Sequence, residues 1–214
     1  MTAPAGARRP GVFLDRDGTL IEDVGYLDTL TRLAVFPWTV DAVRALNRAG
    51  LPVVVITNQS GVARGYFSEQ FVDETHRALD GTLTAGGARV DAYYYCPHHP
   101  DGVVAEYRQR CDCRKPGRAL VDRAAQALGL DAAQSFVVGD KWADVELARA
   151  VGARAILVRT GSGAVEERRP RAGLAADAVV DNLAAAASWI LMHVNPQSVN
   201  PQSNPQSAIR NPQC

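Results

Sequence analysis

The amino-acid sequence predicts an α/β fold built on a doubly wound parallel sheet. Short, continuous apolar runs alternate along the chain with segments of helical periodicity. Continuous apolar runs are typical of parallel strands that helices cover on both faces. Three of these runs end in polar residues that can carry chemistry. Since ligands of such sheets bind outside the carboxyl ends of the strands, the fold class also indicates where a site would lie.

The predicted strands are six apolar runs, the sixth of which is a weak candidate for an edge strand: 11–14, 51–56, 92–95, 135–138, 153–158 and 178–180. The predicted helices lie between them or after the last, at 38–49, 68–83, 118–128, 143–151 and 183–193. Local signals support several helix ends. Pro37 suits a helix start, Ser68 suits an N-cap, and Gly152 suits a C-cap.

The chain divides into three segments of different composition. Residues 1–10 are a short N-terminal extension, and residues 11–194 are expected to form one catalytic domain with a metal-binding loop at 96–115. Residues 195–214 repeat the sequence NPQS and contain almost no apolar side chains. Because such a segment buries too little surface to offset its ordering entropy, we expect a disordered tail with Cys214 as an exposed thiol.

Charge and hydropathy exclude several classes of protein. The 214 residues include 23 basic and 23 acidic side chains, so the net charge is zero and no broad nucleic-acid or membrane surface is expected. No apolar stretch approaches the roughly 20 residues of a membrane span. The apolar run after Arg8 and Arg9 is too short for a signal peptide. The sequence therefore predicts a cytoplasmic protein, which we expect to be a monomer.

Carboxylates follow two of the predicted strands. Asp15 and Asp17 follow the first run, and in extended backbone their side chains point to the same side while Arg16 points away. Adjacent carboxylates repel each other and favour a bound cation. Asp140, at the end of the fourth run, supplies a third carboxylate, and this oxygen-rich set suits Mg²⁺. The pattern predicts a magnesium site at this edge of the sheet.

The remaining polar residues suit phosphoryl chemistry. Thr57 offers a hydroxyl after the second run, and the chain's only two lysines, Lys115 and Lys141, offer compact positive charges. The Asp15 carboxylate can attack phosphorus and form an aspartyl-phosphate. Asp17 can protonate the leaving oxygen and later activate water. Neither a P-loop nor a GxGxxG motif is present, which disfavours an ATPase or a dinucleotide-binding enzyme.

A second group of potential metal ligands follows the third predicted strand. Cys96 and His98 form one pair and Cys111 and Cys113 another, and together they offer the four nitrogen and sulfur ligands of tetrahedral zinc. His99 is an alternative to His98 as the nitrogen ligand. Four protein ligands close the coordination shell, so we expect a structural zinc that orders the loop. Reduced cysteines without a metal are the alternative interpretation.

The motifs DRDGT, TNQSG, CPHHP, CDCRKP and VGDK, in this order, resemble those of the haloacid-dehalogenase-like phosphatases over about residues 12–190. The resemblance implies a Rossmann-like core without a large cap domain, catalytic Mg²⁺ and a zinc-bound loop. It implies that Asp15 is the nucleophile and Asp17 the acid and base, while Thr57 and Lys115 bind the transferred phosphoryl group.

The resemblance also implies the ligands of both metals and the substrate contacts. Mg²⁺ ligands would be Asp15, Asp17 through its backbone carbonyl, and Asp140, with Asp144 behind them. The zinc ligands would be Cys96, His98, Cys111 and Cys113. Substrate contacts would come from two stretches and two single residues: Asp23, Val24, Gly25, Tyr26, Asn58, Gln59, Ser60, Arg114 and Lys141.

Within that family, the combination of the aspartate motif with the cysteine loop is similar to the branch that acts on small phosphorylated sugars and histidinol phosphate. The resemblance implies hydrolysis of the 7-phosphate of heptose 1,7-bisphosphate, with histidinol phosphate or another small phosphosugar as the alternative substrate. An open site would admit a second phosphate beside Arg114, whereas Arg64 is more simply a surface charge. A zinc-stabilised binding protein and a nucleic-acid 3′-phosphatase are further alternatives, and the complete set of catalytic residue types and the neutral charge disfavour them.

Overall fold

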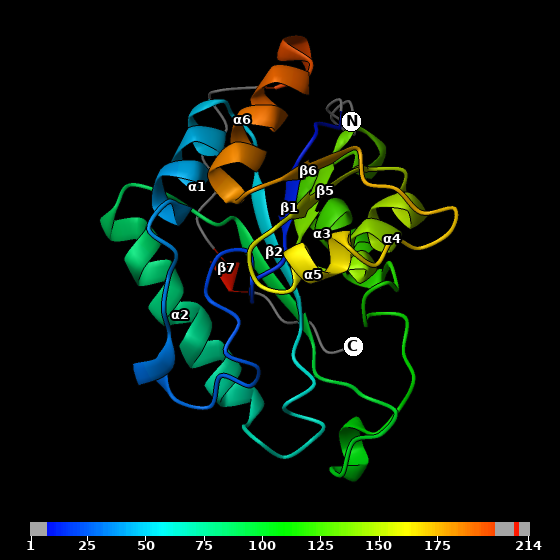
Figure 1. Ribbon diagram of the computed structural model, residues 1–214. Helices are drawn as coiled ribbons and strands as arrows, with labels where there is room; N and C mark the ends of the chain where they lie inside the picture. Colours follow the sequence, from blue (N-terminus) through cyan, green and yellow to red (C-terminus); the bar gives the residue numbers. More distant parts are fainter. Residues whose placement is uncertain (1–7, 200–207, 210–214) are drawn as a thin grey trace, which may run out of the picture.

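Seven parallel strands form one sheet in this computed structural model, which describes residues 8–199 and 208–209 (Figure 1). In space the strands lie in the order β6-β5-β4-β1-β2-β3-β7. Their bounds are β1 (Val12–Leu14), β2 (Val53–Asn58), β3 (Ala92–Cys96), β4 (Phe136–Gly139), β5 (Arg154–Val158), β6 (Ala178–Val180) and β7 (Ala208–Ile209). Because successive strands are added first on one side of β1 and then on the other, the predicted doubly wound parallel sheet is confirmed.

Helices cover both faces of this sheet (Figure 1). One face carries α1 (Thr39–Arg48), α2 (Glu69–Ala85) and α6 (Leu183–His193), and the other carries α3 (Ala119–Leu128) and α4 (Trp142–Val151). Alternate residues of each strand supply the two cores. Val12 and Leu14 pack with α1, α2 and α6, whereas Phe13 between them packs with α3 and α4. Burial on both faces is why the strands are continuously apolar.

The predicted elements are all present, with bounds that agree within two residues. Ser68 caps α2, and its hydroxyl accepts a hydrogen bond from the backbone of Phe71 at 3.2 Å. Gly152 ends α4 with a positive φ of 77°, as the C-cap prediction required. The sequence analysis missed α5 (Gly163–Glu167). Five residues are too few to show a helical period.

The predicted ends of the chain lie mostly outside the described residues. For the predicted disordered tail, 195–214, the structure describes only 195–199 and 208–209. A short 3-10 helix, η4 (Pro196–Ser198), follows α6, and β7 pairs with the edge strand β3 over two residues. Disorder of the remaining tail stays a prediction. Among the described residues, no helix has both the length and the apolar character needed to cross a bilayer.

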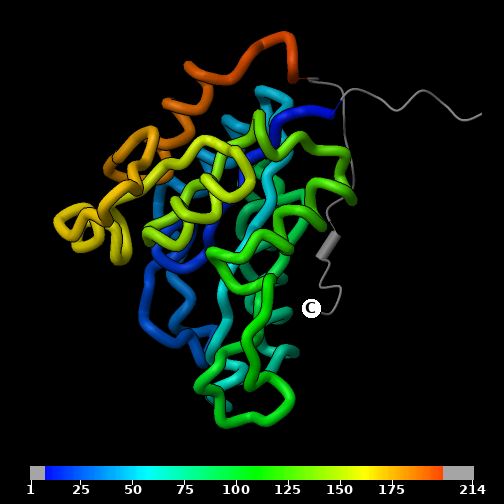
Figure 2. The backbone as a smooth tube through the Cα atoms, turned by 90° about the vertical axis from the view of Figure 1, so that its right-hand side faces the viewer, coloured from blue at the N-terminus to red at the C-terminus, as the bar shows by residue number. Residues whose placement is uncertain are grey.

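Two loops at the carboxyl edge of the sheet stand where a cap domain would be inserted. Residues 15–38 contain only the 3-10 helix η1 (Leu30–Arg32), and residues 97–118 contain only η2 (Ala105–Tyr107). The second loop, drawn in green, projects beyond the sheet in both views (Figures 1 and 2). Neither described loop is large enough to be a domain, so the expectation of a site without a large cap is confirmed.

Leu46 on α1 tests the core that covers one face of the sheet. The side chain is fully buried in the core that includes β1 and α6. We expect Leu46→Ala to lower the free energy of unfolding by about 2–5 kcal/mol, because it leaves a cavity. Met192→Ala, at a side chain that is 74% exposed, should change it by less than about 0.5 kcal/mol. Urea denaturation measures both, and equal effects would contradict the packing described.

Candidate active site

The candidate site lies where three neighbouring strands end. Strand β1 pairs with β2 on one side and with β4 on the other, and Leu14 is in register with Val55 and Val138. Asp15 therefore emerges between Thr57 at the end of β2 and Asp140 just after β4. Residues that lie up to 125 positions apart in the sequence meet because parallel strands share one carboxyl edge.

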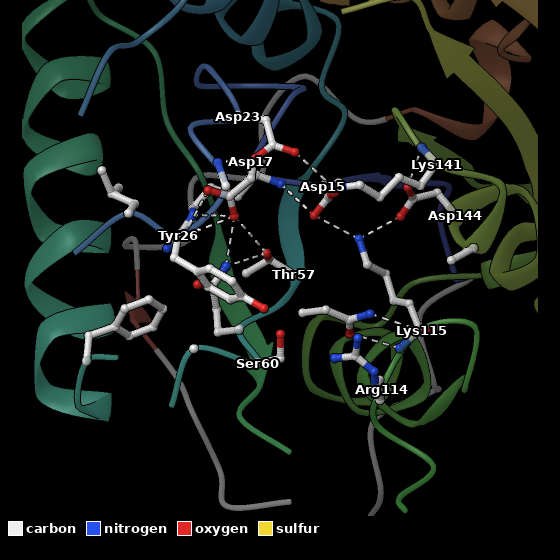
Figure 3. A pocket seen from close by; sticks show the side chains of 18 residues that line it. Asp15, Asp17, Asp23, Tyr26, Thr57, Ser60, Arg114, Lys115, Lys141 and Asp144 are labelled. Atoms are coloured by element: carbon white, nitrogen blue, oxygen red, sulfur yellow. Dashed lines mark hydrogen bonds and ion pairs between the residues drawn. The ribbon is translucent and has the colours of Figure 1, made fainter. Parts of the chain in front are cut away.

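A cavity of about 340 Å³ opens at this edge (Figure 3). It is lined by twelve of the thirteen side chains expected to be catalytic or substrate-binding: Asp15, Asp17, Asp23, Gly25, Tyr26, Thr57, Asn58, Gln59, Ser60, Arg114, Lys115 and Lys141. Val24 is the exception, since its side chain packs against the core beneath the loop. Asp140 is fully buried below the cavity.

Lys115 is held between two carboxylates. Its ammonium nitrogen lies 2.8 Å from Asp15 Oδ1 and 2.6 Å from Asp144 Oδ1 (Figure 3). Burial by itself would lower the pKa of Lys115, but Asp144 and Asp15 outweigh burial and raise the pKa, so the side chain is charged. A buried ammonium beside the expected nucleophile is placed to offset negative charge on a phosphoryl group.

Asp144 supports this lysine. One of its oxygens accepts from Lys115, and the other accepts from the backbone N–H of Lys141 at 3.1 Å, at the start of α4. The residue was expected to lie behind the metal ligands, and its position agrees with that expectation. Both of its oxygens are already hydrogen-bonded, which distinguishes it from Asp140.

Asp15 and Asp140 offer oxygens to a cation. Asp140 Oδ1 is buried and accepts no hydrogen bond within the described part of the chain, although Lys141 Nζ lies 3.8 Å away. Burial, followed by repulsion from Asp15, raises the pKa of Asp140 to about 7. Oxygens of Asp15, Asp140 and Asp144 lie within 4.8 Å of one another. A buried carboxylate pair with an unpaired oxygen fits Mg²⁺, which binds hard oxygen ligands.

A loop after β5 completes this end of the site, and the sequence analysis missed it. Ser162 donates its backbone N–H to Asp140 Oδ2 at 2.8 Å, and the Thr160 hydroxyl donates to the Gly18 carbonyl at 2.6 Å. Gly18 has a φ of 82°, and a Cβ atom there would lie 2.4 Å from the Asp140 carboxylate. The signal in the sequence was the glycine-rich run 160–163, which follows a strand as the other site segments do.

Asp17 lies on the opposite side of Asp15 from Lys141 and Asp144 (Figure 3). Its carboxylate accepts hydrogen bonds from Gln59 at 2.8 Å and, more weakly, from Thr57 at 3.5 Å. Arg16 does not simply point away, as expected from extended backbone. Its guanidinium lines the cavity and turns towards Asp17. Nε and Nη2 each donate a hydrogen bond of 3.1 Å to the Asp17 carboxylate.

The loop at 23–26 forms one wall of the cavity. Asp23 accepts hydrogen bonds from the backbone of Gly25 at 2.9 Å and from Lys141 Nζ at 3.2 Å. Tyr26 is 39% exposed and packs edge-to-face on Tyr66, with ring centroids 4.6 Å apart. Lys141 Nζ also lies 3.8 Å from Asp140 Oδ1, so this lysine connects the wall with the Asp140 end of the site.

Asn58 uses its side chain on the neighbouring loop. Its amide oxygen accepts from the backbone N–H of Lys115 at 2.9 Å, and its amide nitrogen donates to the carbonyl of the same residue at 3.2 Å. This paired contact fixes the lysine backbone against the end of β2. Asn58 was expected to contact substrate, and the geometry gives it a second task, which is to align Lys115.

The four predicted zinc ligands cluster at the base of the projecting loop. The sulfurs of Cys96 and Cys111 are 3.5 Å apart and those of Cys111 and Cys113 are 3.3 Å apart. His98 Nδ1 lies 3.5 Å from Cys113 Sγ. Tetrahedral zinc with bonds of about 2.3 Å would place two sulfurs about 3.8 Å apart, so the donor set fits zinc.

His99 faces away from this cluster. Its Nδ1 accepts from the backbone N–H of Asp101 at 3.1 Å, and its Nε2 lies 3.3 Å from Arg64. Arg114, next in the chain to Cys113, lines the cavity and donates to the His98 carbonyl at 3.4 Å. The cysteine cluster therefore anchors the segment that carries both Arg114 and Lys115.

The fold and the site define a phosphatase of the haloacid-dehalogenase-like class. A family model described as HAD-hydrolase-like matches residues 112–186. The sequence is 40% identical over 92% of this chain to a D-glycero-beta-D-manno-heptose-1,7-bisphosphate 7-phosphatase of Escherichia coli K12, of which it covers 96%. It is 47% identical over 71% of this chain to a protein of that name from Rhodopseudomonas palustris, of which it covers 84%.

Solved structures agree with these relatives. A crystal structure of D,D-heptose 1,7-bisphosphate phosphatase from B. bronchiseptica, complexed with magnesium and phosphate, superposes with a TM-score of 0.78 at 32% identity. The match covers 86% of this chain and 99% of that one. The chain belongs to the family of the D-glycero-beta-D-manno-heptose-1,7-bisphosphate 7-phosphatases, within the HAD-like hydrolases.

Adjacent histidines provide a test of the zinc cluster. We expect the purified protein to hold about one zinc per chain, and His98→Ala to lose it with a fall in Tm, because the cluster loses its nitrogen ligand. His99→Ala should keep the zinc, since that ring faces Arg64. Metal analysis of both variants decides, and loss of zinc from His99→Ala alone would show that the ligand was assigned to the wrong histidine.

Lys115 and Lys141 provide a matched pair for the phosphoryl site. We expect Lys115→Arg to lower kcat/KM by about 100-fold or more, because a planar guanidinium does not fit between two carboxylates that hold an ammonium. Lys141→Arg should cost less than about fivefold, since that side chain is 42% exposed. Steady-state phosphate release measures both. Activity of Lys115→Arg within about twofold of wild type would contradict the assignment.

Proposed function

We propose that the protein hydrolyses the 7-phosphate of D-glycero-D-manno-heptose 1,7-bisphosphate and releases heptose 1-phosphate. The proposal rests mainly on the buried Lys115, whose ammonium group is hydrogen-bonded to Asp15 at the carboxyl ends of three parallel strands. The names of the relatives supply the substrate, and they specify the β anomer, which is therefore the first form to test. Heptose 1-phosphate would then be available for nucleotide activation and glycan synthesis.

The proposed nucleophile is Asp15. Its Oδ1 accepts hydrogen bonds from Lys115 and from the backbone N–H of Arg16 at 2.8 Å each. Within the described part of the chain Oδ2 has no hydrogen-bond partner, so this oxygen is free to attack phosphorus. Attack would form an aspartyl-phosphate and expel the sugar oxygen. Thr57 and Lys115 line the same cavity and would bind the phosphoryl oxygens.

The proposed acid and base is Asp17. It would give a proton to the leaving sugar oxygen and then take one from the water that hydrolyses the aspartyl-phosphate. Mg²⁺, held by Asp15, Asp140 and the Asp17 carbonyl, would supply positive charge that stabilises the transferring phosphoryl group. Asp144 and Asn58 would keep Lys115 aligned through the contacts described above.

Arg114 and the wall at 23–26 are the proposed contacts of the rest of the substrate. Among the described residues no domain covers the cavity, so a sugar with a second phosphate can enter. Arg114 lines the cavity on the side opposite Asp23 and carries the positive charge that a second phosphate needs (Figure 3). Histidinol phosphate lacks that second phosphate and remains the alternative substrate.

The protein's surroundings are part of the proposal. We place it in the cytoplasm as a monomer that acts on a small phosphosugar, without a nucleic-acid or membrane partner. The zero net charge supports the last point. Cys96, Cys111 and Cys113 form no disulfide within the described part of the chain and belong to one metal-type cluster, which suits a reducing compartment. One chain supplies every residue of the proposed site, and sedimentation would test the monomer.

Phosphate release from heptose 1,7-bisphosphate and from histidinol phosphate, measured side by side, tests the function. We expect Mg²⁺-dependent turnover that EDTA stops, with kcat/KM for the bisphosphate higher by about 10-fold or more because of the additional phosphate contact. Asp15→Asn should lose essentially all turnover, since it removes the nucleophile. Preference for histidinol phosphate would replace the substrate but keep the chemistry. Near-normal turnover by Asp15→Asn would contradict the mechanism in which Asp15 is the nucleophile.

A further inference from the structure

Arg16 is the one buried cation of the site that the proposed chemistry does not use. Its side chain is 2% exposed, although it stands between the two catalytic aspartates in the sequence. A buried guanidinium requires partners for its donors. Two of its nitrogens, Nε and Nη2, donate to Asp17 Oδ2 and Oδ1 at 3.1 Å each. This two-pronged contact fixes the plane of the Asp17 carboxylate.

The third guanidinium nitrogen points away from Asp17 to a histidine. Arg16 Nη1 lies 3.4 Å from His76 Nε2. Arginine can only donate, so Nε2 must accept and the imidazole proton must sit on Nδ1. Burial and the charge of Arg16 hold the pKa of His76 well below its usual value, which agrees with a neutral ring.

The histidine ring itself is fixed by its surroundings. His76 is fully buried on α2, stacks on Tyr93 with centroids 4.8 Å apart, and meets Tyr95 edge-on at 5.8 Å. Its Nδ1 finds no hydrogen-bond partner in the described part of the chain. An apolar side chain would fill this space without an unpaired polar atom. Packing alone therefore does not explain a histidine here, whereas its contact with Arg16 does.

We propose that Arg16 and His76 are positioning residues that hold the Asp17 carboxylate in line for proton transfer to the leaving oxygen. The inference rests on the proposed role of Asp17 as acid and base. The connection runs from α2 through His76 to Arg16 and then to Asp17, so the packing of α2 on β3 sets the direction of a side chain at the end of β1. Gln59 completes the arrangement from the other side, since it donates to the same carboxylate.

The test compares substrates that differ in their need for an acid. Aryl phosphates from p-nitrophenyl to phenyl phosphate have progressively poorer leaving groups, and the heptose alkoxide is poorer still. We expect His76→Leu to lower kcat/KM about 10-fold for heptose 1,7-bisphosphate but less than about twofold for p-nitrophenyl phosphate, which leaves without protonation. His76→Gln, whose amide oxygen can replace the Nε2 acceptor, should stay within about twofold of wild type on both.

A second variant guards against loss of folding. Arg16→Lys keeps the charge but cannot reach both Asp17 oxygens and His76 at once, so it should show the same selective loss. The double variant with His76→Leu should lose no more than Arg16→Lys alone, because both act through Asp17. Equal losses on all substrates, or no loss on any, would overturn the inference.

The wild-type protein separates this inference from the proposed function. Turnover of aryl phosphates without turnover of the heptose bisphosphate would reject the substrate, and the leaving-group dependence across the aryl series would still decide the role of Arg16 and His76. No Mg²⁺-dependent turnover of any phosphomonoester would reject both.

Discussion

The crowding of negative charge at the end of β1 is the constraint on which the rest of the site depends. Asp15, Asp140 and Asp144 place buried oxygens within 4.8 Å of one another, and their mutual repulsion is costly without cations. Lys115 offsets part of this repulsion, because its ammonium group binds two of the three carboxylates. Asp140 keeps a buried oxygen that accepts no hydrogen bond from any described residue. Three carboxylates and one ammonium group leave two negative charges, which one divalent cation would neutralise. A related crystal structure contains magnesium with phosphate.

The position of Lys115 in turn requires the projecting loop to be ordered. The lysine lies two residues after Cys113, whose sulfur belongs to the four-residue cluster, and its backbone is held by Asn58 from β2. A loop of this length has few apolar contacts of its own, so metal ligands are an effective way to fix it. The zinc-type cluster and the proposed phosphoryl site therefore depend on each other structurally, because the cluster orders the loop that carries Lys115.

Two aspartates separated by one residue experience different environments. Asp15 faces an ammonium and the buried acidic cluster, whereas Asp17 faces Arg16 and Gln59. Burial by itself would raise the pKa of Asp17, but the charge and hydrogen bonds of Arg16, with Gln59, bring the net pKa below its usual value in the site without substrate. The role proposed for Asp17 as an acid therefore requires the negative charge of a bound phosphate to raise that pKa. Different partners for two nearby carboxylates are a general way to give them different roles. Here the difference comes from elements that surround β1 on opposite sides.

The sequence by itself determined the strands, the main helices and the candidate residues of the site, because apolar periodicity and motifs are local properties. It placed Asp15, Thr57, Asp140 and the cysteine cluster correctly in relation to the strand ends. Only the tertiary structure decided which partners those residues have. The contacts of Asp144 with Lys115, of Ser162 with Asp140, and of His76 with Arg16 join distant parts of the chain. Side-chain direction and helix packing fix such contacts, and neither leaves a periodic signal in the sequence.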